Sequence, residues 1–124
     1  MSKPLTPLEM AESIIKTMGM RSWVCDENLN IYMRRGYHCL YKGAISDVCL
    51  DIANVEATSP GNGAFTRFLE QVEEKVRQSE ACHHVFIESI LNVRLAGYLK
   101  RRGYASTVNS NTLAPNMFKR FANE

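Results

Sequence analysis

The sequence lacks the features that mark several large classes of protein. Its 124 residues include four cysteines but no C-x-x-C pair, so we expect reduced thiols rather than a disulfide framework. No apolar run reaches the roughly 18 residues of a membrane-spanning helix, and the chain opens without a secretory signal pattern. Repeats, low-complexity segments and interdomain linkers are missing too. These absences predict one domain over residues 1–124, cytoplasmic and without a membrane partner.

The charge balance is nearly neutral and leaves the class of partner open. Fifteen Lys and Arg against thirteen Asp and Glu give a net charge of +2, which suits a phosphorylated ligand as well as nucleic acid. A basic surface could form from Arg94, Lys100, Arg101, Arg102, Lys119 and Arg120. A nucleic-acid reader would interleave stacking aromatics with such a surface, and Tyr98 and Tyr104 are expected to have packing roles instead. Nucleic acid is therefore not the expected partner, although a small binder of nucleic acid or of a host protein stays as an alternative.

Hydrophobic periodicity predicts an α/β (α+β) domain with a mixed sheet. The capping box Thr6–Glu9 with Pro7 starts a helix that runs to about Met18. Further helices are expected at 64–79 and 92–102, and strands at 21–25, 29–34, 37–42, 48–57, 84–90, 107–109 and 117–121, with turns at 26–28, at Arg35-Gly36 and near Gly43. The early strands form an antiparallel meander, and the strand–helix–strand order makes 48–57 and 84–90 a central parallel pair flanked by helices.

The chain is organised around residues 48–66, where an apolar strand runs into a glycine turn and then a helix. Leu50 and Ile52 fall on one face of the strand, and Cys49, Ala53, Val55 and Ala57 on the other. Pro60 ends the strand, and Gly61 and Gly63 let a ligand approach the backbone. Amides at the start of the following helix, at the positive end of its macrodipole, can seat a phosphate. An ordinary strand–turn–helix connection would show the same pattern.

From Asp51 to Tyr104 these motifs resemble the GNAT N-acetyltransferase superfamily. Pro60-Gly61-Asn62-Gly63-Ala64-Phe65 stands where that family has its Arg/Gln-x-x-Gly-x-Gly/Ala phosphate turn. Asn92 resembles the family's helix Asn, and Gly103-Tyr104 its closing Gly-Phe, at matching separation. The segments 52–65 and 88–92 are also similar to the very small members that bacteriophages carry.

The resemblance implies acetyl-CoA (coenzyme A) as cofactor. It implies an N-acetyltransferase that moves an acetyl group to a primary amine of a small molecule or protein by direct attack in a ternary complex. Pantetheine would lie between the two parallel strands and pair with the backbone of the first. The implied cofactor-binding residues are Val55, Ala57, Gly61, Asn62, Gly63, Ala64, Phe65, Thr66 and Asn92.

Three departures from the family pattern favour an alternative, a non-catalytic GNAT-like module that binds coenzyme A or a protein. Pro60 replaces the Arg or Gln of the turn, and Phe65 replaces its second small residue. Leu99 stands where many members have the tyrosine that acts as acid toward the leaving thiolate, and Tyr98 is one position off, rotated by about 100° on a helix.

Acetyl transfer needs a base for the amine and a proton donor for the thiolate. Glu56 and Glu88, near the ends of the two parallel strands, are the candidate bases, and Tyr98, with Tyr104 behind it, is the candidate acid. Solvated strand-end carboxylates and aromatic core packing are the simpler interpretations of the same residues.

Two further features of the sequence do not point to one defined role. Cys82-His83-His84 lacks a second ligand group at zinc spacing, so no metal is expected there. Apolar residues among Met18, Met20 and Trp23 could line a homodimer interface or belong to the core.

Overall fold

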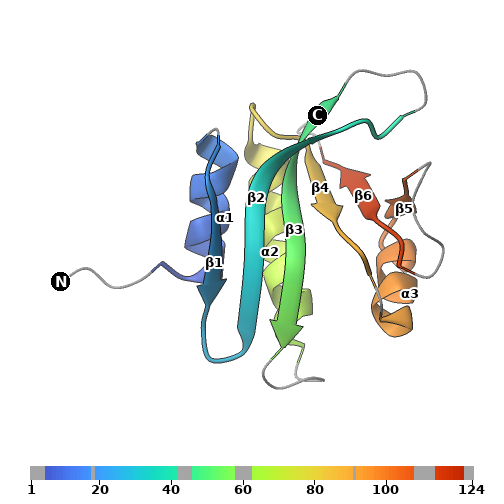
Figure 1. Cartoon of the computed structure of the whole chain (residues 1–124), viewed down its shortest axis with the longest axis horizontal. Helices are drawn as coiled ribbons and strands as arrows, with labels where there is room; N and C mark the ends of the chain where they lie inside the picture. Colours follow the sequence, from blue (N-terminus) through green and yellow to red (C-terminus); the bar gives the residue numbers. More distant parts are fainter. Residues whose placement is uncertain are drawn as a thin grey trace.

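The computed structural model describes residues 5–17, 19–41, 46–57, 63–90, 92–107 and 114–121, with the side chains of residues 56 and 57 left aside. Its elements are α1 (Pro7–Lys16), β1 (Arg21–Cys25), β2 (Leu29–His38), β3 (Asp47–Ala57), α2 (Ala64–Gln78), β4 (His84–Ile87), α3 (Val93–Arg101), β5 (Ala105–Ser106) and β6 (Met117–Arg120). The strands form a six-stranded sheet in the order β1-β2-β3-β4-β6-β5 (Figure 1).

The sheet is mixed, as the sequence predicts. Strands β1, β2 and β3 form an antiparallel meander, whose first turn is closed by Asp26 Oδ1 accepting from the N–H groups of Asn28 and Leu29. Strand β4 runs parallel to β3 because α2 carries the chain back along the sheet between them. Strand β6 is antiparallel to both β4 and β5. The predicted α/β architecture with one parallel pair is therefore confirmed.

Local signals set the helix ends. The capping box between Thr6 and Glu9 is formed, with Pro7 in the first turn of α1. Helix α2 begins after Gly63, which has φ 77°, and α3 begins where the Asn92 side chain accepts from the N–H groups of Arg94 and Leu95. Helix α3 is followed by Gly103 with φ 93°. These starts and stops agree with the sequence to within one or two residues, and Met18 lies outside the described residues.

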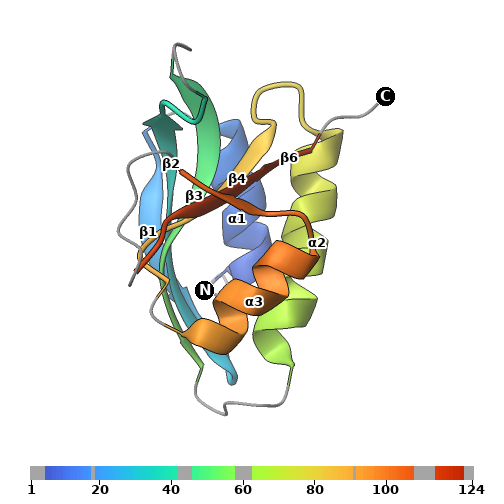
Figure 2. The same cartoon turned by 90° about the vertical axis from the view of Figure 1, so that its right-hand side faces the viewer.

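All three helices lie on the same face of the sheet (Figure 2). The main core fills the space between them and the sheet, with Ile14 from α1, Leu69 from α2, Leu99 from α3 and Leu50 from β3. The opposite face, which we call the open face, carries a small apolar cluster of Leu40, Cys49, Phe86 and Phe118. None of the helices in the described part of the chain has the length and apolar character needed to span a bilayer.

Strand β2 passes straight through the expected turn at Arg35-Gly36. The two predicted strands, 29–34 and 37–42, are one strand that ends at His38. Gly36 is there because the Asp51 carboxylate lies against its backbone: a Cβ would collide with that carboxylate, and even the farther oxygen, Oδ1, would lie 2.9 Å away. Glycine within a strand marks such a close approach as well as a turn, and here the turn interpretation is wrong.

Strand β3 contains a β-bulge that overturns part of its predicted face pattern. Met33 pairs with Ile52 and Tyr32 pairs with Asn54, so Ala53 is an extra residue. Beyond the bulge the alternation is shifted, and Val55 packs against the main core on the side of Leu50 and Ile52 rather than on the opposite face. A prediction that assumes strict alternation of side-chain faces along the strand cannot anticipate this shift.

Other predicted strands differ in extent. Strand β4 ends at Ile87, three residues before the expected end, because Ser89 adopts φ 48°. The strand expected at 107–109 is instead the short β5 at Ala105–Ser106, and residues 108 and 109 lie outside the described residues. Strand β6 agrees with the expected 117–121 to within one residue.

Candidate functional site

The parallel strands β3 and β4 separate partway along their length. Their ladder runs from Cys49–His84 to Ile52–Ile87, and the Glu88 N–H still donates to the Ile52 carbonyl at 3.1 Å. The chain then turns toward the segment before β6, since the N–H of Ser89 donates to Asn116 Oδ1 at 2.7 Å and that of Ile90 to the Pro115 carbonyl at 2.9 Å. Beyond the bulge, β3 continues to Ala57 with its ladder partners on β2, so the two parallel strands diverge (Figure 1).

The start of α2 combines features that attract an anion. Gly63 at the N-cap position adopts φ 77° and provides no side-chain cap for the first amides. Arg67 Nη1 lies 3.1 Å from the position that a Cβ on Gly63 would occupy, so a guanidinium lies beside the turn. The positive end of the macrodipole adds to this charge. Gly61 and Asn62, the other predicted phosphate-turn residues, lie outside the described residues.

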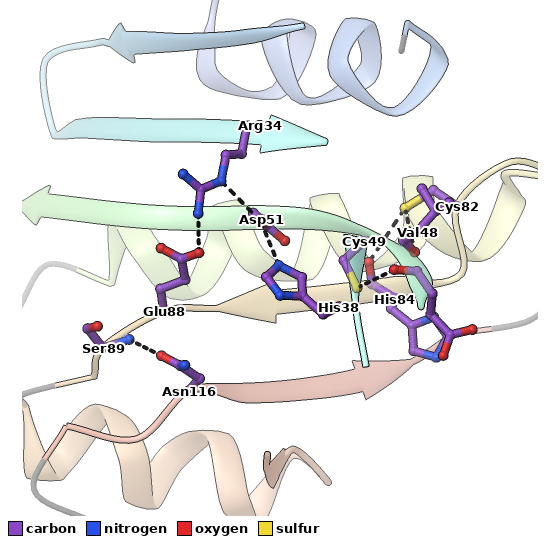
Figure 3. Close-up of polar contacts among 11 residues, drawn as sticks. Arg34, His38, Val48, Cys49, Asp51, Cys82, His84, Glu88, Ser89 and Asn116 are labelled. Atoms are coloured by element: carbon purple, nitrogen blue, oxygen red, sulfur yellow. Dashed lines mark hydrogen bonds and ion pairs between the residues drawn. The ribbon is translucent and has the colours of Figure 1, made fainter. Parts of the chain in front are cut away.

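The open face carries four charged or polar side chains that contact one another, Arg34, His38, Asp51 and Glu88, which we call the polar cluster. Arg34 Nε donates to Asp51 Oδ2 at 3.2 Å, and Arg34 Nη2 donates to Glu88 Oε1. His38 Nε2 lies 2.8 Å from the same Asp51 Oδ2. Figure 3 shows these side chains in front of the sheet, with helix α2 behind it.

Sheet register brings the polar cluster together. Arg34 is directly opposite Asp51 on β3, and Gly36 and His38 follow Arg34 at intervals of two along β2. On the other side of Asp51, its β4 partner is Phe86, and Glu88 comes two residues later. The His38 ring stacks on Phe86 with centroids 3.7 Å apart, which fixes its orientation. All four side chains therefore reach the same face, at the point where β3 and β4 separate.

Asp51 is the centre of the cluster and is 0% exposed. A buried carboxylate is tolerated only with charge or hydrogen-bonding partners, and Arg34 and His38 supply these for Oδ2. Oδ1 is also buried, and within the described part of the chain it has no hydrogen-bond partner. Burial alone would lower the pKa of Arg34, but its interactions with Asp51 and Glu88 outweigh this and raise that pKa, so the guanidinium stays charged.

The predicted catalytic residues lie in different places. Glu88 belongs to the polar cluster. Glu56 pairs with Asn30 at the far end of β3, beyond the bulge. The Tyr98 hydroxyl is buried without a hydrogen-bond partner among the described residues, and its ring lies under the Arg102 guanidinium, 5.7 Å from the centroid. The structure therefore brings Glu88, but not Tyr98, into the cluster.

Tyr104, the second candidate acid, has a structural partner. Its hydroxyl donates to Glu73 Oε2 at 2.8 Å, and Glu73 also binds Arg102. Burial, together with the neighbouring Glu73 charge, raises the pKa of Tyr104. Leu99, at the family's tyrosine position, is fully buried in the main core.

The predicted cofactor residues form two groups along the diverging strands. Val55 and Ala57 are on the part of β3 beyond its ladder with β4, and Ala64, Phe65 and Thr66 form the first turn of α2. Asn92 caps α3 with its side-chain oxygen, 2.9 Å from the Arg94 nitrogen and 3.1 Å from the Leu95 nitrogen.

Sequence reasoning missed three members of the polar cluster, namely Arg34, His38 and Asp51. One signal was present: Asp51 is the single charge within the apolar run Val48–Ala53. An ionised residue in a buried strand needs a partner, and the partners are in β2, where Arg34 and His38 share the parity of Gly36. The register that joins the strands was not available from the sequence.

Comparison with known proteins identifies the fold. No protein-family model matches this sequence, and a comparison with curated protein sequences gave no match either. Among solved structures, the chain is similar to Arabidopsis thaliana Naa50 in complex with the bisubstrate analogue CoA-Ac-MVNAL, with a TM-score of 0.52 and 16% sequence identity over 79% of this chain and 67% of that chain. Naa50 is a GNAT N-acetyltransferase. Because the identity is low, the likeness concerns the fold alone, and this chain has a GNAT-like fold.

Proposed function

We propose that this protein is an acetyl-CoA-dependent N-acetyltransferase that acetylates a primary amine of a small molecule or protein. One observation carries the proposal: within a GNAT-like fold, β3 and β4 separate after Ile52 and Ile87, and a carboxylate, Glu88, lies at the point of separation. The matched Naa50 structure contains a CoA bisubstrate analogue, which supports the same ligand class for this fold.

The residues of the two diverging strands fit a pantetheine arm and a pyrophosphate. Beyond the bulge, the β3 backbone near Val55 and Ala57 has its ladder partners on β2, so its other edge suits strand addition by the amides of pantetheine. The first turn of α2, with Gly63, Ala64, Phe65 and Thr66, would hold the pyrophosphate together with Gly61 and Asn62, and Arg67 lies beside that turn. Asn92, at the start of α3, completes the proposed cofactor-binding set. When bound, acetyl-CoA supplies an acetyl group on a thioester that an amine can attack.

Glu88 is the proposed base. Its Oε1 accepts from Arg34, which holds the carboxylate at the open face and points to an acceptor that arrives from that face. Glu88 would take the proton that the amine loses as its nitrogen bonds to the acetyl carbon and the carbon–sulfur bond breaks. Glu56 is the second candidate for this role, and Tyr98 the candidate donor to the leaving sulfur.

A non-catalytic GNAT-like module that binds coenzyme A or a protein is the alternative function. The observation that favours it is Leu99, which is 0% exposed and contributes only apolar packing where many members have an acidic tyrosine. A transferase without that tyrosine would need Tyr98 or water as its acid.

Calorimetric titration of the protein with acetyl-CoA, coenzyme A and ATP tests the proposal. Binding of the first two, with ATP much weaker, is expected, because the pantetheine arm rather than phosphate alone provides the selectivity. Absence of acetyl-CoA binding would contradict both the transferase and the coenzyme A module. If acetyl-CoA binds, turnover on a panel of small-molecule and peptide amines separates an enzyme from a binding module.

A further inference from the structure

We propose that the polar cluster is a binding site for a divalent first-row transition metal ion of the Zn²⁺ type, with His38, Asp51 and Glu88 as its protein ligands. Each of the three offers one donor atom, and these atoms lie within 4.8 Å of one another. One imidazole nitrogen and two carboxylates suit zinc and its neighbours, whereas Ca²⁺ and Mg²⁺ prefer oxygen ligands alone. This inference does not rest on the proposed acetyltransferase function.

The buried Asp51 carboxylate is a second observation that favours a cation at this site. Asp51 is 0% exposed, and its Oδ1 has no hydrogen-bond partner among the described residues although it is fully enclosed. Leaving a buried, charged oxygen unpaired is unfavourable. A metal ion held between Asp51, His38 and Glu88 would add charge compensation next to that oxygen.

The charge of the cluster also favours a further cation. Asp51 and Glu88 are negative and Arg34 is positive, which leaves one uncompensated negative charge when His38 is neutral. Arg34 now bridges both carboxylates, and its side chain is 39% exposed, so the guanidinium can swing into solvent. A divalent ion in its place would neutralise both carboxylates. Arg34 would therefore compete with the metal ion for the Asp51 and Glu88 carboxylates. Replacing Arg34 tests this competition directly.

Titration of the untagged protein with Zn²⁺ by calorimetry, and with Co²⁺ by visible absorption, tests the site. One ion per chain is expected, with Co²⁺ bands that lack a thiolate charge-transfer contribution, because the ligands are nitrogen and oxygen. His38→Ala and Glu88→Gln should each weaken binding about tenfold or more, since even changes to outer-shell partners of a metal cost about 10–100-fold in affinity. Glu74→Gln, which removes an exposed carboxylate from α2 on the other face of the sheet, should leave the affinity unchanged.

Arg34→Gln should have the opposite effect. Removing the competing positive charge is expected to strengthen Zn²⁺ binding about tenfold or more, because the guanidinium repels an incoming cation and occupies the two carboxylates that would bind it. Arg120→Gln is the matched control: by its pairing with His84 and its spacing from Phe118, Arg120 lies on the same face but outside the cluster. A general effect of net charge would raise the affinity equally in both variants, and that result would contradict the site.

Three further outcomes would overturn the inference. One is the absence of Zn²⁺ and Co²⁺ binding by the wild-type protein, and another is binding that His38→Ala and Glu88→Gln leave unchanged. The third is a thiolate band that disappears in Cys82→Ser, which would place the ion at Cys82-His83-His84 instead.

The folding of the variants is checked before each titration by cooperative thermal melting. His38 and Glu88 are partly exposed, so their variants should fold. Because Glu88 is also the proposed base, bound Zn²⁺ should inhibit any acetyl transfer.

Discussion

At the residue scale, Asp51 explains several features that look unrelated in the sequence. A carboxylate on a fully buried strand position requires positive or hydrogen-bonding partners, and it receives them from Arg34 and His38 on β2. Its position also explains Gly36, since any larger residue there would collide with the carboxylate. One buried charge therefore dictates the residue types at three positions of the neighbouring strand.

Gly36→Ala tests this packing. The new methyl group would collide with the Asp51 carboxylate, so we expect the free energy of unfolding to fall by about 1–3 kcal/mol, the usual cost of overpacking. Gly97→Ala in α3 is the control, because its new methyl has Arg101 Nη1 at 3.4 Å as nearest atom and alanine favours helix. Chemical denaturation measures both. If Gly36→Ala were as stable as the wild type, the carboxylate would not lie against Gly36.

Glu88→Gln tests the proposed base. Glutamine keeps the shape of the side chain but cannot accept the amine proton, so the kcat of acetyl transfer should fall about 10²–10⁴-fold while the Kd for acetyl-CoA stays unchanged. Steady-state kinetics with an acceptor from the amine panel, beside calorimetry, separates the two quantities. Glu56→Gln is the competing variant. If it alone reduces kcat, the base is Glu56, and if neither does, water or another group takes the proton.

At the element scale, β3 sets the geometry of the site. It pairs with β2 along its whole length, only its first half also pairs with β4, and its bulge at Ala53 bends it. Strand β4 contributes to the separation, because Ser89 adopts φ 48°, a region that residues other than Gly, Asn and Asp rarely occupy. Strain of this kind is often found at functional sites, and here it turns the chain away from β3 directly after Glu88.

Gly63→Asp tests the anion seat at the start of α2. A carboxylate at this position would repel the coenzyme pyrophosphate, so acetyl-CoA affinity should fall about tenfold or more, in line with a coupling of roughly 1.4 kcal/mol between adjacent like charges. Gly63→Asn is the matched control, because asparagine has the same shape, no charge, and tolerates the φ of 77° that this position requires. Calorimetry on both folded variants gives the comparison. Equal affinities would remove Gly63 from the cofactor site.

The link between α2 and the end of α3 depends on Glu73. This buried carboxylate binds Arg102 and accepts the Tyr104 hydroxyl, so Glu73→Gln should destabilise the protein by about 3 kcal/mol and Tyr104→Phe by about 1 kcal/mol. Chemical denaturation of both single variants and the double variant measures their coupling. The two losses should not add, because Glu73→Gln replaces the charged acceptor of the hydrogen bond that Tyr104→Phe removes. Additive losses would contradict a direct contact between these side chains.

At the scale of the whole molecule, the sheet has two unequal faces. The three helices cover one face, which holds the main core (Figure 2). The open face holds the smaller apolar cluster beside the polar cluster. A sheet covered by helices on one face leaves polar groups on the other face accessible to ligands. Both proposals, amine acetylation and metal binding, therefore concern the open face.

The four cysteines report on the integrity of the whole fold. Cys25 and Cys39 are exposed, whereas Cys49 and Cys82 are buried, and burial raises the pKa of both buried thiols. Because the thiolate is the reactive form, DTNB should modify two thiols quickly and the other two only as fast as the protein unfolds. Cys25→Ser with Cys39→Ser should abolish the fast phase alone. Rapid modification of all four thiols would contradict the burial of Cys49 on the open face and of Cys82 in the main core.

The sequence by itself determined the features that depend on neighbours a few residues apart. The capping box of α1, the Asn92 cap of α3 and the strand–helix–strand order that makes β3 and β4 parallel all follow from local hydrogen bonding and periodicity. Glu88 was also reached this way, as a charged residue at a strand end. The mixed α/β sheet is the consequence of these local choices.

Only the tertiary structure decided the strand β2 that continues through Gly36, the face of Val55 beyond the bulge, and the polar cluster. Arg34 contacts Asp51 across 17 residues of sequence and Glu88 across 54, and no local rule sets the register of such pairs. The physical reason is that the partners of a buried charge lie on neighbouring strands of the sheet, far away in the sequence. For the same reason, the sequence alone does not distinguish a glycine such as Gly36, which leaves space for the Asp51 carboxylate on the neighbouring strand, from a glycine in a turn.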